Sequence, residues 1–389
     1  MKIAQVHNYY RNPGGEDVVV EAERKLLRDH GHSVESFTAS NSDIADGRQL
    51  AVALGSVWNQ GTSRRFRAFL ERTRPDLVHC HNTFPLLSPS VYYAARAERV
   101  PVVQTLHNFR LACPNALLFR DGKPCEECLA RVIKWPAVRH ACYRTSRLAS
   151  GSVAVMLAAH WAVRTWSRTV NVYISLSRFA RRKAIAGGLP AERIVVKPNF
   201  VPTDLTAGAG DGGFCLFVGR LSAEKGVSTL LEAWNLLENP PLLLIVGDGP
   251  LADELGFDAA EQPRIRWLGG KAPHEVHDLM GAARLVIVPS ESYETFGLVV
   301  IEAFAKGTPV LGANSGALGD LIEPGQTGQL FTPGDAQDLA ANVQGLLAAP
   351  RQLDAMRASA RAEYEKKYTA AGNYPLLLQI YERARLTTV

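Results

Sequence analysis

Near the C-terminus the sequence reads Ser290-Glu291-Ser292-Tyr293-Glu294-Thr295-Phe296-Gly297-Leu298-Val299-Val300-Ile301-Glu302, directly after the run Leu285-Val286-Ile287-Val288-Pro289. The β-branched run predicts a buried strand, and the residues after it predict a tight turn that opens into a helix. Glu294 would then lie in the loop and Glu302 about two turns inside the helix. The first N–H groups of such a helix attract anions, whereas two carboxylates suit the hydroxyls of a sugar. The stretch therefore predicts a pocket for a sugar attached to a phosphate.

The rest of the chain alternates short apolar runs with helical segments. In the first half, strands are predicted at 2–7, 33–37, 76–81, 100–106, 170–175 and 194–196, with a helix at 17–30. In the second half they are predicted at 214–218, 242–246, 265–268, 285–288 and 309–311. Such alternation predicts doubly wound parallel sheets of the α/β class, which bind ligands at the carboxyl ends of their strands.

The 389 residues exceed the size at which one core keeps growing, which predicts two domains. Residues 198–213 are rich in Pro, Gly, Thr and Asp and are interpreted as the linker. We therefore predict Rossmann-like domains at 1–198 and 199–365, followed by a terminal segment at 366–389. Apolar and aromatic residues at helical spacing predict one amphipathic helix from Tyr364 to Ala384.

The chain resembles glycosyltransferase family 4 at three places: Glu294 and Glu302 with seven residues between them, the stretch Ala303–Val310 that follows, and Gly316 with Asp320-Leu321-Ile322 behind it. The resemblance extends over nearly the whole chain. It implies a GT-B fold, with two Rossmann-like domains facing each other across a cleft and a C-terminal helix that crosses back to the first domain. It also implies a hexosyltransferase-type enzyme that takes its sugar from UDP or GDP and retains the anomeric configuration.

The loop Gly219-Arg220-Leu221-Ser222-Ala223-Glu224-Lys225-Gly226 follows the first predicted strand of the second domain. Fixed cations there would stabilise the negative charge that develops on a diphosphate leaving group. In related enzymes the matching Arg and Lys have this role, which we carry to Arg220 and Lys225. A surface salt-bridge loop is the alternative interpretation.

The resemblance also implies the other donor contacts. Glu302 would bind the ribose hydroxyls, and Glu294 would hold the sugar together with the backbone of Thr295, Phe296, Gly297 and Leu298. The base and ribose would be lined by two further loops, which contain Gly247, Asp248, Gly269 and Lys271.

Two features of the first half are predicted to contribute to the site. Gly14-Gly15 lies between a strand and a helix, where a simple turn is one interpretation; in the family the pair lets the backbone approach the donor phosphate. His107 ends a predicted strand and would contact a sugar hydroxyl or the phosphate. His81, at the preceding strand end, is a weaker candidate for the acceptor site. Glu294, His107, Arg220 and Lys225 form the predicted catalytic set.

Charge divides unevenly along the chain. Residues 1–200 hold 29 basic and 15 acidic residues, a net charge of +14, and the remainder holds 14 and 23, a net charge of −9. A basic half suits an anionic membrane surface or a lipid-pyrophosphate acceptor; solvated Arg-rich helices are the alternative. No recognised nucleic-acid module accompanies the charge, which disfavours nucleic acid. We see no export signal or membrane span, so we expect a cytoplasmic protein, peripheral on the inner face of the plasma membrane.

The expected mechanism needs no cofactor beyond the nucleotide-sugar donor. No Asp-X-Asp occurs in the chain, which argues against the metal-dependent GT-A class and for catalysis without Mg²⁺. We favour same-face attack in which the departing phosphate takes the acceptor proton. The acceptor would be lipid-linked or a polysaccharide in cell-envelope glycan synthesis. The alternatives are a soluble family member acting on a small metabolite, a sugar-nucleotide epimerase and a non-catalytic sugar-nucleotide binder.

Four of the six cysteines cluster in the first half, as Cys113, Cys125, Cys128 and Cys142. A Cys-X-X-Cys pair flanked by two more cysteines fits a structural Zn²⁺ site of four thiolates. The flanking spacings are irregular, and we favour four reduced, partly buried thiols.

Overall fold

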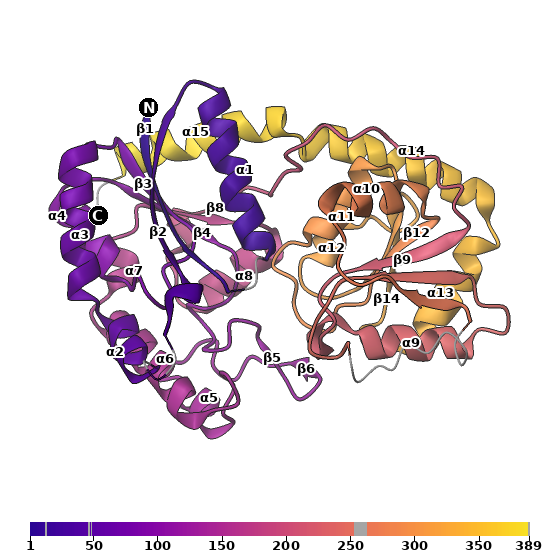
Figure 1. The fold of residues 1–389 in the computed structure, drawn as a ribbon, viewed down its shortest axis with the longest axis horizontal. Coiled ribbons are helices and arrows are strands. Elements are labelled where there is room, and N and C mark those ends of the chain that lie inside the picture. Colours follow the sequence, from indigo (N-terminus) through magenta and orange to yellow (C-terminus); the bar gives the residue numbers. More distant parts are fainter. Residues whose placement is uncertain (12–13, 46, 48, 253–262, 388–389) are drawn as a thin grey trace. The chain divides into compact units, whose positions relative to one another are not determined.

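The chain forms two compact units, shown in Figure 1. The computed structural model describes residues 1–389 except 12–13, 46, 48, 253–262 and 388–389. The first unit contains Met1–Leu118, Cys125–Pro198 and Asn373–Val389, and the second contains Phe119–Pro124 and Asn199–Gly372.

The first unit is built on a sheet of six strands, all parallel. In spatial order they are β2 (Ser33–Ser40), β1 (Lys2–Tyr9), β3 (Leu77–Cys80), β4 (Val102–Leu106), β7 (Val172–Ser175) and β8 (Ile194–Val196). The strand order reverses between β1 and β3, and this switch point is where doubly wound sheets place their ligands. The order is the flavodoxin-like one.

Helices lie on both faces of this sheet (Figure 1). They are α1 (Gly15–Asp29), α2 (Gln49–Val57), α3 (Gln60–Thr73), α4 (Ser90–Ala97), α5 (Trp135–Arg139), α6 (Arg147–Ala162), α7 (Thr165–Arg168) and α8 (Arg178–Ala186), with 3₁₀ turns η1 (Asn41–Asp43) and η2 (Ala191–Arg193). A capping box starts α1, because the Asp17 carboxylate accepts a hydrogen bond of 2.8 Å from the backbone N–H of Gly14. The buried face of α1, which includes Val20 and Leu27, packs on the sheet.

The second unit is a separate doubly wound sheet with its own core. Its parallel strands lie in the order β11 (Ile265–Trp267), β10 (Leu242–Val246), β9 (Phe214–Val218), β12 (Leu285–Val288), β13 (Val310–Ala313) and β14 (Gly328–Phe331). Numbered along the unit this is 3-2-1-4-5-6, the order of dinucleotide-binding folds, and its switch point falls between β9 and β12. Its helices are η3 (Ala223–Lys225), α9 (Val227–Leu236), α10 (Pro273–Ala282), α11 (Leu298–Ala305), α12 (Leu318–Leu321), α13 (Ala336–Leu347) and α14 (Pro350–Lys367).

The C-terminal tail corrects one prediction. In place of a single helix from Tyr364 to Ala384, α14 ends at Lys367 and α15 (Ala370–Leu386) begins after a break. At the break, the Tyr368 carbonyl accepts a hydrogen bond of 3.0 Å from the distant Val201 N–H, and the Thr369 hydroxyl accepts the N–H of Gly372.

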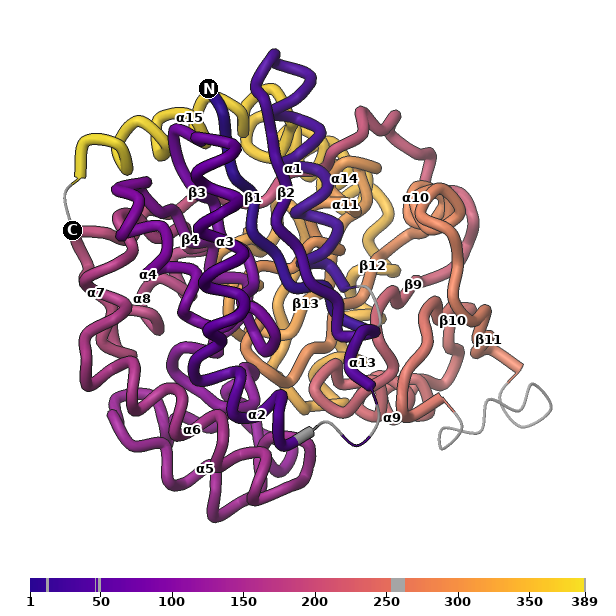
Figure 2. Tube along the Cα trace, turned by 60° about the vertical axis from the view of Figure 1, so that its left-hand side comes forward, coloured from indigo at the N-terminus to yellow at the C-terminus, as the bar shows by residue number. Residues whose placement is uncertain are grey.

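The last helix, α15, belongs to the first unit, as the fold prediction required (Figure 2). The hydroxyl of Tyr381 is 2.8 Å from His79 of β3, and Asn373 accepts a hydrogen bond of 2.8 Å from Lys197. Both contacts are buried, so polar side chains hold α15 to the sheet.

Three strands were not foreseen from the sequence. They are β14 and the two strands of an antiparallel hairpin, β5 (Phe119–Arg120) and β6 (Lys123–Pro124). Among the residues the structure describes, no helix combines the length and apolarity needed to cross a bilayer.

Candidate active site

The switch point of the second unit brings two loops together, one after β9 and one after β12. The backbone N–H groups of Glu291 and Ser292 both donate to the carbonyl of Glu224, at 3.1 and 3.2 Å. Gly226 has a φ of +68°, and a Cβ there would lie 2.0 Å from the carbonyl oxygen of Pro289. Only glycine permits both this conformation and this approach of the two loops.

Across these loops, Lys225 and Glu294 form an ion pair although 69 positions separate them. The Lys225 Nζ is 2.5 Å from Glu294 Oε1, which also accepts a hydrogen bond of 2.7 Å from the Ser290 hydroxyl. Burial by itself would raise the pKa of Glu294, but the Lys225 ammonium and these hydrogen bonds lower it below its usual value. Glu294 is therefore ionised at neutral pH. An ammonium has three N–H donors, so Lys225 can also serve an anionic ligand.

A third loop holds the backbone of Glu294. Its carbonyl accepts a hydrogen bond of 2.9 Å from Ala317. Gly316 has a φ of +63°, and a Cβ there would lie 2.4 Å from the Glu294 nitrogen. The glycine predicted from the family motif is thus required by the close approach of the β13 loop to Glu294.

Glu302 lies closer to the start of its helix than predicted. Helix α11 begins at Leu298 after Gly297, so Glu302 is about one turn inside it and not two. Burial raises the pKa of Glu302 to about 7. Among the described residues, no ion-pair partner compensates this carboxyl, which sets it apart from Glu294.

The other predicted donor residues occupy neighbouring strand ends. The backbone of Asp248 accepts a hydrogen bond of 3.0 Å from Leu221, and that of Gly269 accepts one of 2.9 Å from Gly247, so the loops after β9, β10 and β11 adjoin. Arg220 is exposed in the same loop system. Lys271, two residues before α10, lies 3.7 Å from Glu275 in the first turn of that helix, in a surface pair.

Thr295, Phe296 and Gly297 form the turn before α11. The Phe296 side chain is buried, with its ring centroid 6.2 Å from that of Tyr368. Phe296 is therefore a core side chain, and its contribution to an anion site is restricted to its backbone N–H beside the helix N-terminus.

In the first unit, His107 follows β4 at the carboxyl edge of the sheet. Its Nε2 is 3.0 Å from Nδ1 of His81, and the two rings stack with centroids 5.3 Å apart. Burial and the nearby His7, His79 and Lys197 hold the pKa of His107 well below its usual value. His107 is therefore a neutral imidazole at pH 7.

A buried polar network lies next to the His81–His107 pair. Glu23, only 1% exposed, pairs at 2.9 Å with the equally buried Lys197, and its second oxygen lies 3.6 Å from His81 and 3.7 Å from His79. Within the described part of the chain, Glu23, His79 and His81 are the single group of His, Cys, Asp or Glu close enough to share a metal ion. Two features disfavour that use: the Lys197 ammonium already neutralises Glu23, and both nitrogens of His79 are hydrogen-bonded, to Tyr381 and Thr105, at 2.8 Å.

Glu16 is a candidate site residue that the sequence interpretation did not single out. It follows Gly15 in the first turn of α1, where Tyr10 donates to it at 3.2 Å and the side-chain amide of Asn108, the neighbour of His107, donates at 3.3 Å. Burial raises its pKa to about 8, against the effect of these two hydrogen bonds. The sequence signal that could have identified Glu16 is its carboxyl group, two residues after Gly14 at the turn between a strand and a helix.

Gly14 is exposed and has an ordinary extended conformation, and a Cβ there would meet nothing within 4 Å. The fold itself therefore does not require glycine at this position. The missing side chain leaves the backbone at the start of α1 exposed, and approach to a donor phosphate there stays a prediction from the family resemblance.

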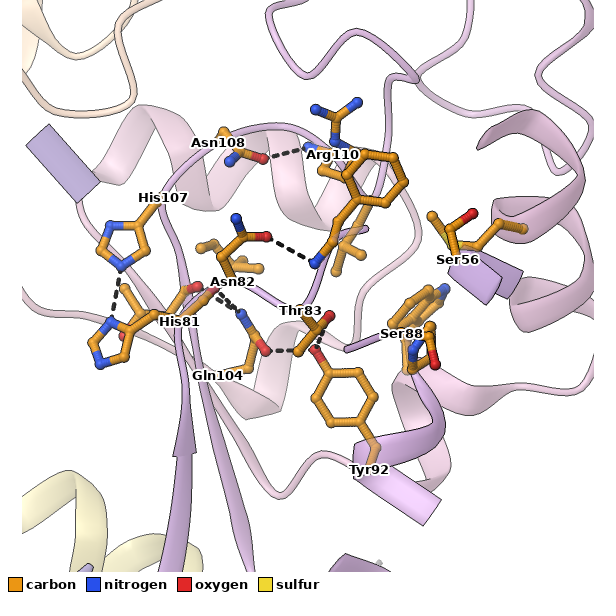
Figure 3. A pocket seen from close by; sticks show the side chains of 17 residues that line it. Ser56, His81, Asn82, Thr83, Ser88, Tyr92, Gln104, His107, Asn108 and Arg110 are labelled. Carbon is orange, nitrogen blue, oxygen red and sulfur yellow. Dashed lines mark hydrogen bonds between the residues drawn. The ribbon is translucent and has the colours of Figure 1, made fainter. Parts of the chain in front are cut away.

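A pocket opens beside His107 in the first unit (Figure 3). Its polar lining includes Asn82, Thr83, Gln104 and Asn108, and the Arg110 guanidinium stacks 4.6 Å from the ring centroid of Phe84. The hydrogen bonds drawn in Figure 3 fix several of these groups, among them Gln104, which donates to the His81 carbonyl at 2.8 Å. Amides, hydroxyls and one cation suit a polyhydroxylated or anionic ligand.

All six cysteines are free thiols in the structure. Cys113 and Cys128 are buried, and electrostatic interactions link Cys113 and Cys142 to Cys128. Burial, followed by these neighbouring thiols, raises the pKa of Cys128 to about 11. Lys134 lies fully buried next to them and donates a hydrogen bond of 2.8 Å to the Cys128 carbonyl.

Two family models cover most of the chain. Residues 14–199 match the glycosyl transferase 4-like domain, and residues 207–363 match the glycosyl transferases of group 1. The chain is 28% identical over 366 residues to the glycogen synthase of Mycobacterium tuberculosis, covering 88% of this chain and 77% of that protein. It is 31% identical over 327 residues to the D-inositol 3-phosphate glycosyltransferase of Mycolicibacterium paratuberculosis, covering 79% and 67% of the two.

The crystal structure of Anabaena Alr3699/HepE in complex with UDP and glucose has a similar fold, with a TM-score of 0.71, 21% identity and coverage of 98% and 99% of the two chains. Two doubly wound parallel sheets with this match define the GT-B class. The chain belongs to the group 1 glycosyltransferases with a family 4-like N-terminal domain, and it is a hexosyltransferase-type enzyme.

Proposed function

We propose that this enzyme is a retaining glycosyltransferase that moves a sugar from UDP or GDP to a lipid-linked or polysaccharide acceptor in cell-envelope glycan synthesis. The observation that carries the donor assignment is the Lys225–Glu294 pair of 2.5 Å at the switch point of the second unit. It joins a cation for the diphosphate to a carboxylate for the sugar hydroxyls, and Glu302 follows on the adjoining helix. The UDP bound to HepE supports the same donor class.

In the proposed reaction, the bond between the sugar C1 and the diphosphate oxygen breaks as the acceptor oxygen bonds to C1 on the same face. The acceptor proton passes to the departing phosphate oxygen, and the products are the glycoside and the nucleoside diphosphate. Lys225 and Arg220 would stabilise the charge on the leaving group, which grows in the transition state. His107, neutral at pH 7, would hydrogen-bond a sugar hydroxyl without adding charge.

A thermal-shift screen with UDP, GDP, ADP and their sugar conjugates tests the donor site, since a ligand that binds only the native state raises Tm. We expect one base to shift the wild type, and Lys225→Ala and Glu294→Ala to lose the shift together with at least about a hundredfold in transfer rate. Lys367→Ala is the matched control, because Lys367 pairs with Glu363 on an exposed helix face. Near-normal turnover of the Lys225 or Glu294 variant would refute the assignment.

A small-molecule acceptor is the second candidate, favoured by the name of the relative that acts on D-inositol 3-phosphate. Incubation with radiolabelled donor and either a membrane lipid extract or soluble polyols separates the two. Label in the organic phase supports the lipid-linked acceptor, label in high-molecular-mass material supports the polysaccharide acceptor, and label only in low-molecular-mass water-soluble product supports the second candidate.

Structural zinc at Cys113, Cys125, Cys128 and Cys142 stays a separate proposal, which rests on the Cys-X-X-Cys spacing. Among the described residues these four thiols do not form a group close enough to share a metal ion. Metal analysis of the purified protein tests it. One zinc per chain would support the four-thiolate site, and substoichiometric metal would favour free thiols.

A further inference from the structure

Large apolar side chains are exposed on or directly beside three helices of the first unit. Leu54 is 66% exposed on α2, Ile133 is 66% exposed just before α5, and Leu148 is 89% exposed on α6. The same elements expose five more large apolar side chains: Leu50, Trp58, Val132, Trp135 and Val155. We call these eight residues, with the helices that carry them, the α2/α5/α6 surface. Single exposed apolar residues need no explanation, but a group of this size indicates an interaction site.

The packing of the helices places the elements that carry these residues at one end of the unit. Helix α6 packs against both α2 and α5, and the three helices lie together in Figures 1 and 2. Leu50 and Leu54 are four residues apart, and Leu148 and Val155 are seven apart, so each pair shares one helix face. The opposite face of α6, with Met156 and Leu157, is buried in the core.

Basic residues predominate along the α5 and α6 part of this surface, although Glu126 and Glu127 are exposed directly before it. Residues 128–191 contain 11 Lys and Arg and no Asp or Glu. Arg131, Arg139, Arg144 and Arg147 are exposed on or beside α5 and α6. By contrast, Arg67 of α3 is paired with Glu98 at 2.8 Å.

We infer that the α2/α5/α6 surface docks the enzyme onto an anionic lipid bilayer. Apolar side chains surrounded by arginines are what interfacial binding requires, with the apolar groups entering the acyl boundary and the cations meeting anionic headgroups. The two exposed tryptophans fit the interfacial zone. A second copy of the chain fits poorly, because a two-fold interface would bring the same arginines against each other.

The α2/α5/α6 surface adjoins the pocket beside His107, and this position gives a reason for the enzyme to dock through that surface. Ser56 of α2 and Met156 of α6 line that pocket, and their helices carry the exposed apolar residues outward. Docking would bring the pocket to the level of the headgroups. This last step rests on the proposed lipid-linked acceptor, whereas bilayer binding itself does not.

The test is cosedimentation of the full chain with vesicles of phosphatidylcholine alone or with 30% phosphatidylglycerol added. Vesicles with 30% phosphatidylglycerol should bind the wild type, and vesicles of phosphatidylcholine alone should not. A Leu54→Gln/Ile133→Gln/Leu148→Gln variant should bind at least about tenfold more weakly, and each of Arg144→Gln and Arg147→Gln should weaken binding roughly fivefold at low salt. Leu236→Gln, on α9 of the second unit, is the matched control with an exposed leucine and should bind normally.

Equal binding by the wild type and the triple variant would overturn the inference. So would a wild-type dimer in light scattering that the triple variant converts to a monomer, because the surface would then be a protein interface. Donor-induced thermal shifts, measured on the same variants, should not change. Loss of vesicle binding with an intact donor shift therefore separates this inference from the proposed function.

Discussion

Glu302→Gln tests directly how burial acts on the candidate site. The pKa of Glu302 is raised to about 7 from an ordinary value of 4.5, with burial as the cause. The folded state therefore holds a proton that the unfolded chain releases between pH 4.5 and 7, and wild-type stability falls across that window. At 1.36 kcal/mol for each pKa unit, the full shift corresponds to about 3 kcal/mol, and partial exposure of the side chain makes this an upper value.

Glutamine cannot ionise, so the variant should match the wild type near pH 5 and exceed it by about 1–3 kcal/mol at pH 8.5. In a unit of this size, each kcal/mol moves Tm by about 2–4 °C. Calorimetric melts of the ligand-free protein between pH 5 and 8.5 measure the difference. Glu238→Gln, at an exposed position after α9, is the control and should leave the pH profile unchanged.

Ligand binding should show the opposite preference. Ribose hydroxyls donate hydrogen bonds to an ionised carboxylate, so nucleotide affinity should fall roughly tenfold from pH 8 to pH 6, where about a tenth of Glu302 is ionised. The Gln variant should bind more weakly and without this pH dependence. Coincident stability profiles for the wild type and Glu302→Gln would refute the reasoning, because Glu302 would then be ionised throughout.

Two further substitutions, one in each unit, test the buried contacts that position the candidate site residues. Glu23→Gln leaves the buried Lys197 ammonium without its counter-charge and should lower the free energy of unfolding in urea by about 3–5 kcal/mol. The double variant Glu23→Gln/Lys197→Met should regain much of this stability. If the losses of the two single variants simply add in the double variant, Glu23 and Lys197 do not act as a pair. Gly316→Ala places a Cβ 2.4 Å from the Glu294 nitrogen and should lower both Tm and transfer activity. Gly325→Ala, with a φ of +78° but nothing within 4 Å, carries the strain without the clash, so an equal loss of activity there would refute the steric argument.

Local pattern was sufficient for the elements of the fold. Runs such as Phe214–Val218 and Leu285–Val288 are almost wholly buried, and short apolar runs bounded by turns identify strands of that kind without an alignment. The β14 strand was missed because Gly328–Phe331 contains only two apolar residues. The break between α14 and α15 was missed because a hydrogen bond from Val201 causes it, and helical spacing does not register such a contact.

The sequence by itself determined the α/β class, the strand ends that carry Lys225, Glu294 and His107, and the glycosyltransferase family, because all three depend on residues close together in the chain. The tertiary structure decided the strand orders, the Lys225–Glu294 pair and the burial that raises the pKa of Glu302. It also decided which exposed apolar side chains gather beside the pocket at His107. These properties depend on which crossovers place distant segments side by side and on what then surrounds each side chain, and neither is encoded by local periodicity.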